Sequence, residues 1–175
     1  GLARAIAIDS EILLMDEPFS ALDPLIRRQL QGEFMELANV MNKTTVFITH
    51  DLDEAVRIGN RIAIMRDGRI VQMGTAEEIV LNPADDYVAA FVSGISRLKV
   101  VRAKSIMIKI PTYKKEMGEI PKDASTCLEK SFLNEIVAKN PNSDKPILVK
   151  SESGSLKGII TRDALFKAIV EGVEN

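Results

Sequence analysis

The stretch Leu13-Leu14-Met15-Asp16-Glu17-Pro18 is a short apolar run that ends in two adjacent acids and a proline. Apolar residues over Ile12–Met15 predict a buried β-strand. Carboxylates are costly to bury without a partner or a chemical role, so an acidic pair at the end of such a strand indicates a site. One carboxylate can bind Mg²⁺ through water. The neighbouring carboxylate can orient the water that attacks a phosphate. The alternative interpretation is a strand end with two solvated acids.

Short strands alternate with amphipathic helices after this stretch. A helix is predicted from Pro24 to about Met41, with Asp23 placed to cap it. Thr45–Thr49 is rich in β-branched residues and predicts a second strand, followed by a helix from about Leu52 to Arg57. Strands that alternate with helices indicate an α/β fold with a parallel sheet.

Two local signals extend the pattern. The Asp67-Gly68 pair stands between the apolar runs Arg61–Met65 and Ile70–Met73, and this dipeptide predicts a β-hairpin. The sequence Thr75-Ala76-Glu77-Glu78 predicts a capping box at the start of a short helix.

Charge divides the sequence near residue 98. Residues 1–98 contain nine Lys and Arg against fifteen Asp and Glu, a net charge of −6, and eight of these nine bases are Arg. Residues 99–175 contain fourteen bases against ten acids, a net charge of +4, and twelve of these bases are Lys. The shift predicts two domains, residues 1–98 and residues 99–175.

Composition excludes several classes of protein. Apolar residues make up 46% of the 175 positions, which is typical of a globular chain and not of a disordered one. The longest apolar run is Tyr87–Val92, whereas a membrane-spanning helix needs about 20 residues. The single cysteine, Cys127, cannot form an internal disulfide, which suits a cytosolic protein, and it is interpreted as a packed or surface residue.

The single histidine, His50, directly follows the second predicted strand and precedes Asp51. A lone histidine is usually structural or simply exposed. At the end of a parallel strand it lies where α/β folds place ligands. A histidine there can hold a terminal phosphate and the attacking water through hydrogen bonds.

Residues 14–24, Leu-Met-Asp-Glu-Pro-Phe-Ser-Ala-Leu-Asp-Pro, resemble the Walker B motif and D-loop of ABC ATPases. Phe47–Asp51 resembles the switch-histidine loop of that family, and Gly1–Ala5 looks like the helix after its signature motif. The resemblance continues to about residue 97. It implies an α/β fold that is the C-terminal part of an ABC ATPase, a P-loop NTPase.

The resemblance assigns roles to four residues. It implies that Asp16 binds Mg²⁺, that Glu17 is the catalytic base, and that His50 is the switch at the γ-phosphate. It places Asp23 among the nucleotide-binding residues, at contacts across the ATPase dimer.

The sequence lacks other motifs of the family. It contains no Gly-x-x-x-x-Gly-Lys-Ser/Thr phosphate-binding loop, no glutamine loop, no adenine-stacking aromatic and no signature Ser-Gly-Gly. We expect them upstream of Gly1, because the first residues read as a helix already under way.

The second part resembles a CBS motif over roughly residues 101–172, which implies a small α+β domain. Leu156–Leu165 looks like its closing strand and helix, after a helix predicted over Ser125–Lys139 and a loop between Pro111 and Pro121. In CBS modules that bind adenosyl nucleotides, the positions of Thr161 and Asp163 contact phosphate and ribose. The alternative is that Asp163 caps the final helix.

An ABC ATPase followed by a CBS motif resembles the ATP-binding subunits of bacterial glycine betaine/proline importers. The resemblance implies ATP and Mg²⁺ as cofactors, a second ATPase subunit in a homodimer, and a transmembrane permease. It implies a peripheral location on the cytoplasmic face of the inner membrane. The Lys-rich second part adds an anionic membrane surface as a candidate partner.

Two other functions compete with this interpretation. The first is a CBS-based regulatory module that senses nucleotide or ionic strength and has no activity of its own. The second is a DNA-repair ABC ATPase, which the net charge of −6 and the lack of a basic, aromatic-rich groove disfavour, so no nucleic acid partner is predicted.

Overall fold

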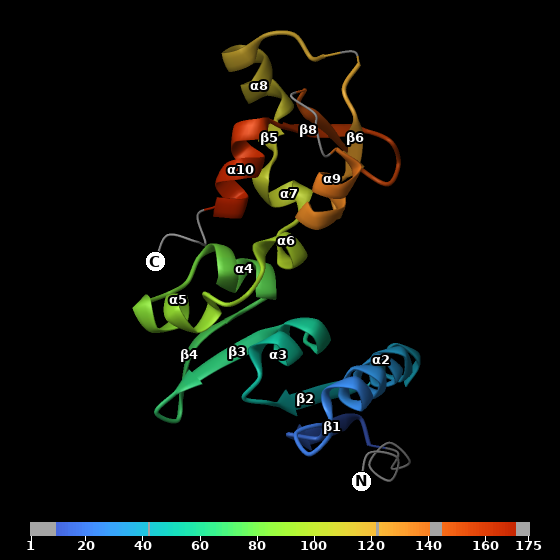
Figure 1. Ribbon diagram of the computed structural model, residues 1–175, viewed down its shortest axis with the longest axis vertical. Helices are drawn as coiled ribbons and strands as arrows, with labels where there is room; N and C mark the ends of the chain where they lie inside the picture. The colour runs from blue at the N-terminus through green and yellow to red at the C-terminus, as the bar shows by residue number, and fades with distance from the viewer. Residues whose placement is uncertain (1–9, 42, 122, 141–144, 171–175) are drawn as a thin grey trace. The chain divides into compact units, whose positions relative to one another are not determined.

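The computed structural model describes residues 10–41, 43–121, 123–140 and 145–170 (Figure 1). The chain forms two compact units, residues 1–62 and residues 63–175. The helix predicted at Gly1–Ala5 lies outside the described residues. A domain boundary at residue 98 stays a prediction.

The first unit is a strand-helix-strand-helix arrangement. Strand β1 (Ile12–Asp16) leads into helix α2 (Pro24–Met41), and β2 (Thr44–Ile48) leads into α3 (Leu52–Ile58). The two strands pair in parallel, with Leu14 opposite Val46. The predicted α/β fold with parallel strands is therefore confirmed.

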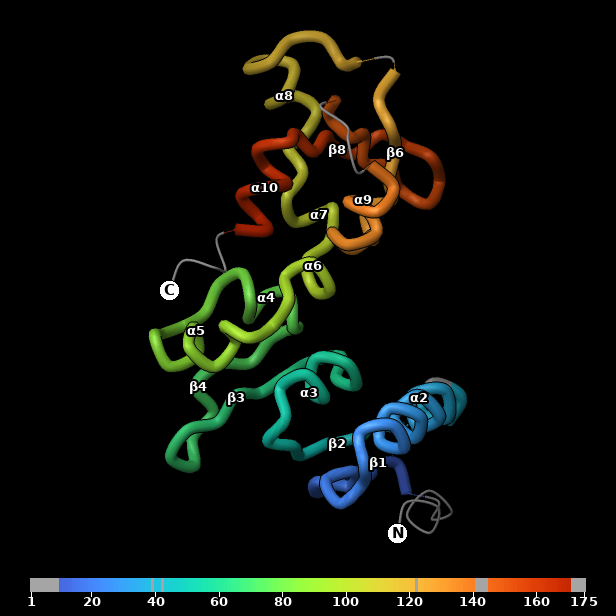
Figure 2. The backbone as a smooth tube through the Cα atoms, in the orientation of Figure 1, coloured from blue at the N-terminus to red at the C-terminus, as the bar shows by residue number. Residues whose placement is uncertain are grey.

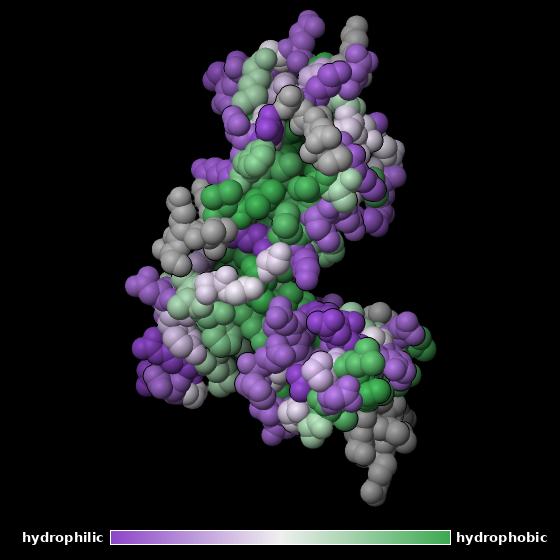
Figure 3. Space-filling view, in the orientation of Figure 1, coloured by the Kyte–Doolittle hydropathy of each residue, from purple (hydrophilic) through white to green (hydrophobic). Residues whose placement is uncertain are grey.

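One face of this two-stranded sheet carries the core of the unit. Phe19, Phe34 and Phe47 form a triangle of rings with centroids 5.9–6.4 Å apart, and Leu13 and Met15 pack beside them. The opposite face is exposed in the described part of the chain, and Leu14 is 74% accessible. The prediction of a buried strand is thus correct for one face only. Apolar side chains also reach the surface over α2 (Figure 3).

The second unit begins with the predicted hairpin. Strands β3 (Ile62–Arg66) and β4 (Arg69–Gly74) neighbour each other, and the intervening Asp67 and Gly68 have φ angles of 50° and 73°. Positive φ at both central residues is what a tight hairpin turn with the right twist requires, and Asp-Gly accepts it readily.

Short helices follow the hairpin. Helix α4 (Ala76–Leu81) begins at the predicted capping box, in which Thr75 and Glu78 bond each other's backbone N–H. Asp85 caps α5 (Asp86–Val92), and the chain continues through α6 (Arg97–Val100).

The rest of the second unit is built around a four-stranded sheet, in the order β5-β8-β7-β6. Strand β8 pairs antiparallel with β5 and β7, and β6 pairs in parallel with β7. Its elements, whose path can be followed in Figure 2, are α7 (Ala103–Ile106), β5 (Ile108–Lys109), α8 (Ile110–Met117), β6 (Thr126–Leu128), α9 (Leu133–Lys139), β7 (Ile147–Lys150), β8 (Leu156–Ile160) and α10 (Arg162–Val170).

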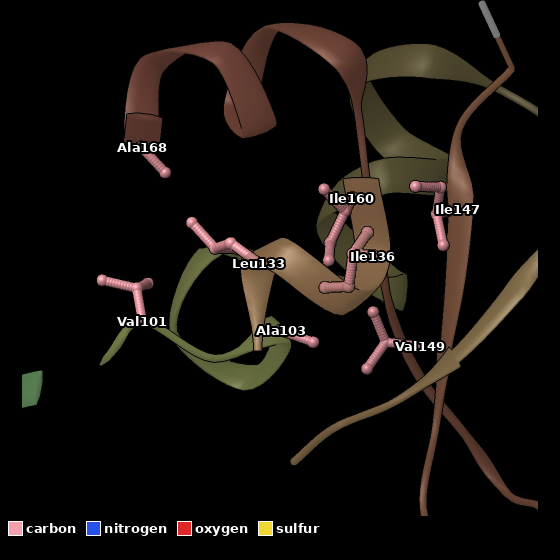
Figure 4. Packing of buried hydrophobic residues seen from close by; sticks show 8 residues of the cluster. All are labelled: Val101, Ala103, Leu133, Ile136, Ile147, Val149, Ile160 and Ala168. Carbon is pink, nitrogen blue, oxygen red and sulfur yellow. The ribbon is translucent and has the colours of Figure 1, made fainter. Parts of the chain in front are cut away.

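The core of this unit gathers side chains from α9, the sheet and the segment around α7 (Figure 4). Leu133 and Ile136 of α9 are fully buried against Val149 of β7 and Ile160 of β8. Leu98 packs against the same cluster, so the core draws on residues from both sides of position 98.

Two predictions for residues 104–139 are wrong in detail. The helix predicted from Ser125 begins only at Leu133, because Thr126–Leu128 pairs with β7 and extends the sheet. The predicted loop after Pro111 is instead helix α8, which accepts a proline in its first turn because no N–H is needed there.

We expect the ring triangle to dominate the stability of the first unit. Phe34 is 3% exposed, so Phe34→Ala should lower the local unfolding free energy by about 3–5 kcal/mol. Native-state hydrogen exchange of the β1 and β2 amides measures this quantity. Val40 lies on the same helix and is 83% exposed, so Val40→Ala should change it by less than about 0.5 kcal/mol. Equal effects of the two variants would contradict the assignment of the core.

Candidate functional site

The carboxyl ends of β1 and β2 lie at one edge of the sheet. Asp16 is the last residue of β1 and pairs with Ile48, the last residue of β2. The N–H of Glu17 donates to the Ile48 carbonyl at 2.9 Å, which continues the pairing by one residue. Parallel pairing in this register therefore brings Glu17 and His50, from segments 33 residues apart, to the same place.

The backbone turns sharply at Glu17. Its φ of 41° lies in the left-handed region, which a residue with a long side chain rarely adopts and which costs about 1–3 kcal/mol. The Ser20 N–H and Oγ both donate to the Glu17 carbonyl, at 3.2 and 3.0 Å, and close the turn. Such strain at the end of a strand is typical of a functional position.

The structure joins the two predicted catalytic side chains. Glu17 Oε1 lies 2.7 Å from His50 Nδ1, within hydrogen-bond distance. The hydrogen bond and the negative charge of Glu17 raise the pKa of His50 above its ordinary value, with smaller contributions from Asp51 and Glu54. The contact uses Nδ1, so Nε2 is the ring nitrogen available to a ligand. The pair is open to solvent, because His50 is 76% and Glu17 41% exposed.

Capping interactions fix the segments beside the pair. Asp23 Oδ1 accepts from the N–H groups of Leu25 and Ile26 at 3.1 Å, which confirms the predicted cap of α2. Asp51 caps α3 by accepting from the Glu54 N–H at 3.2 Å. The role of Asp23 across a dimer stays a prediction.

Asp16 is exposed at the same edge of the sheet. Among the described residues, no group of three or more His, Cys, Asp or Glu side chains lies close enough together to hold a metal ion. A single carboxylate fits Mg²⁺, which keeps several waters and takes further oxygens from phosphates.

Sequence analysis missed two polar residues on the inner side of α2. The Arg27 guanidinium donates to three backbone carbonyls of the turn after β1. Gln31 Nε2 donates to Glu54 Oε1 at 2.8 Å, and both side chains are buried. Gln31 lies three residues before the buried Phe34, so a polar residue within the apolar stripe of the helix was the available signal.

The predicted nucleotide residues of the second part lie at the junction of β8 and α10. Thr161 Oγ1 accepts from the Ala164 N–H at 3.2 Å, so the cap of α10 is Thr161 and not Asp163. Asp163 is exposed in the first turn of the helix. Burial raises the pKa of the half-buried Cys127 thiol to about 11, as suits a packed residue that stays protonated.

Comparison with known proteins confirms the resemblance seen in the sequence. The chain is 50% identical to the glycine betaine transport ATP-binding protein OpuAA of Bacillus subtilis, over 79% of this chain and 32% of the relative. It is 52% identical to the glycine betaine/proline betaine transport system ATP-binding protein ProV of Escherichia coli, over 74% of this chain and 33% of the relative. It is 38% identical to the glycine betaine/carnitine transport ATP-binding protein GbuA of Listeria monocytogenes, over 97% of this chain and 54% of the relative.

The chain thus spans about a third to a half of the length of these curated relatives. No protein-family profile matches it. A solved CBS domain-containing protein of unknown function from Bacillus anthracis covers 70% of this chain and 77% of its own, at 14% identity and a TM-score of 0.26, a likeness too low to inform the fold. Among the residues that the structure describes, every helix is too short or too polar to cross a membrane.

The Glu17–His50 contact predicts a measurable titration. Because His50 is the only histidine, its imidazole NMR signals report one site in the 175-residue chain. Glu17→Gln should lower the pKa of His50, since it removes the largest cause of the increase. The exposed Asp53 is not among the causes, so Asp53→Asn should leave that pKa nearly unchanged.

The sign of the pH dependence follows. A pKa raised by folding stabilises the folded chain fully below the unfolded value of about 6.5, and this contribution is lost as pH rises through the folded pKa. A His50 pKa that is equal in wild type and Glu17→Gln would show that the contact is absent in solution.

Proposed function

We propose that this chain, a homologue of ATP-binding proteins of glycine betaine transport, is part of the ATP-hydrolysing subunit of an importer for glycine betaine or related quaternary amines. The Glu17–His50 contact at the carboxyl edge of a parallel strand pair carries the proposal. It joins a carboxylate that can act as a base to an imidazole that can bind phosphate. The relatives are named for transport of glycine betaine, proline betaine and carnitine, and this supports a quaternary amine as the substrate.

In this proposal Glu17 orients the attacking water and accepts its proton. General bases are most effective when held within hydrogen-bond reach, and the turn at Glu17 together with His50 holds the carboxylate in place. His50 donates from Nε2 to the γ-phosphate of ATP, and its raised pKa favours the charged form that binds an anion.

Asp16 is the residue proposed to hold Mg²⁺, through water. When bound with ATP, the ion neutralises charge on the phosphates. The loop that would hold those phosphates is not in this sequence, so we propose that it lies elsewhere in the intact subunit.

The partners follow from the same proposal. A second copy of the subunit would complete the nucleotide site at Asp23. ATP hydrolysis would drive transport through a transmembrane permease. We propose the cytoplasmic face of the inner membrane as its location. Residues 1–98 would form the ATPase part and residues 99–175 a CBS-like regulatory part.

The alternative is that the second part is a sensor of nucleotide or ionic strength. Thr161 and Asp163 sit together at the β8–α10 junction, as an adenosyl nucleotide would require. Exposed lysines, including Lys109, Lys114 and Lys115, lie on and beside α8, where hydrophilic side chains gather at the surface (Figure 3). These lysines offer a surface for anionic lipid.

Substitution in the intact subunit tests the catalytic assignment. Glu17→Gln should retain ATP binding and lower kcat by about 10²–10⁴-fold, because the water loses its base. His50→Ala should also lower kcat with binding retained. The 175-residue chain, without a phosphate-binding loop, should give no Mg²⁺-dependent turnover above background. Turnover close to wild type in Glu17→Gln would remove Glu17 from the role of base.

Vesicle binding tests the lysine surface. The chain should sediment with phosphatidylglycerol vesicles at low salt and be released as salt is raised, because screening shortens the range of attraction to about 8 Å at physiological ionic strength. Lys114→Glu with Lys115→Glu should weaken binding by at least about tenfold, since each lysine contributes about 1 kcal/mol. Equal binding to neutral vesicles would contradict this role, and AMP binding in calorimetry would support a nucleotide sensor instead.

A further inference from the structure

Arg27 lies in the first turn of α2 and directs its guanidinium back over the turn that connects β1 to the helix. Its Nε donates to the Phe19 carbonyl at 3.1 Å. Its Nη2 donates to the carbonyls of Ser20 and Leu22, at 3.2 and 3.1 Å. One side chain therefore bonds three of the four carbonyls over residues 19–22.

This turn has few other constraints among the described residues. The Ser20 N–H bonds the Glu17 carbonyl, and the Leu22 N–H bonds the Phe19 carbonyl. The Phe19 ring is buried in the core and anchors the middle of the segment. Glu17 stands at one end of the turn and Asp23 at the other, so the path of this backbone sets where both carboxylates lie.

The same face of α2 also contacts the segment that follows His50. Arg27 Nη1 lies 3.9 Å from Asp51 Oδ2, at the outer limit of an ion pair. One helical turn later, Gln31 bonds the buried Glu54 at 2.8 Å. Positions four apart on a helix lie on one face. From that face Arg27 bonds the turn after β1, and Gln31 bonds helix α3, which follows β2.

We propose that Arg27 is a positioning residue, which fixes the turn over Phe19–Leu22 against the His50 segment so that Glu17 and His50 meet. Its importance for hydrolysis rests on the proposed function of Glu17 and His50. Its effect on the turn is a property of the folded chain alone, so the two can be tested separately.

The chemistry explains why the residue is an arginine. The acceptors are three carbonyls at different places along the turn, and a planar guanidinium offers five donors in a fixed fork. A lysine ammonium keeps the charge but is a point donor on a flexible stem. Arg27→Lys therefore separates the hydrogen-bond geometry from the charge. Arg28 is the next residue of α2, and its side chain is exposed. Arg28→Lys therefore provides the matched control.

The first experiment uses the 175-residue chain. In Arg27→Lys, hydrogen exchange at the Ser20 and Leu22 amides should become about tenfold faster, because the turn loses hydrogen bonds that each contribute modestly. The pKa of His50, read by NMR, should fall towards its ordinary value as the Glu17 contact becomes less populated. Arg28→Lys should change neither quantity. Exchange and His50 titration equal to wild type in Arg27→Lys would overturn the proposal.

The second experiment measures ATP hydrolysis by the intact subunit. Arg27→Lys should lower kcat by about tenfold or more and leave KM for ATP within about twofold, because positioning of the base affects the chemical step more than binding. An unchanged kcat in an active subunit would overturn the catalytic consequence. An inactive wild-type subunit would instead contradict the proposed function, and the exchange result would still stand.

A third measurement applies if Arg27→Lys does not fold. Arg27→Ala would be titrated with millimolar ethylguanidinium, which restores the planar donors without the covalent link. Recovery of slow exchange at Ser20 and Leu22, without any effect on Arg28→Ala, would support the proposal. Absence of recovery would overturn it.

Discussion

The in-register parallel pairing of β1 with β2 is the constraint on which the site depends. It places the end of β1 beside the end of β2, so that Glu17 and His50 share an edge although 33 residues separate them. A shift of one residue would reverse the faces of β1 and turn Leu13 and Met15 away from the ring triangle against which they pack. The apolar core therefore fixes the register, and the register fixes the carboxylate–imidazole pair.

Helix α2 also positions the segments that carry Glu17 and His50. Its apolar stripe, through Phe34, holds the sheet, and its polar positions Arg27 and Gln31 hold the two segments that leave the strands. The unfavourable φ of Glu17 is held by the Ser20 N–H and Oγ, which both donate to the Glu17 carbonyl. Stability and positioning thus come from one face of one helix.

The second unit differs from the first in the composition of its core and of its surface. Its core is buried between α9, α10 and a mixed sheet, and most of the exposed basic side chains in its described part are lysines. Thr161 is used for capping α10, which leaves Asp163 as the exposed carboxylate at that junction.

The sequence alone determined the helix Pro24–Met41, the Asp67-Gly68 hairpin, the capping box at Thr75 and the candidate residues Asp16, Glu17 and His50, because these depend on local propensity and on motifs with fixed spacing. It missed the strand Thr126–Leu128, which forms only because β7 supplies hydrogen bonds. It also missed Arg27 and Gln31. Their partners lie in the turn after β1 and in α3, and only the packing of α2 against both brings those groups within bonding distance.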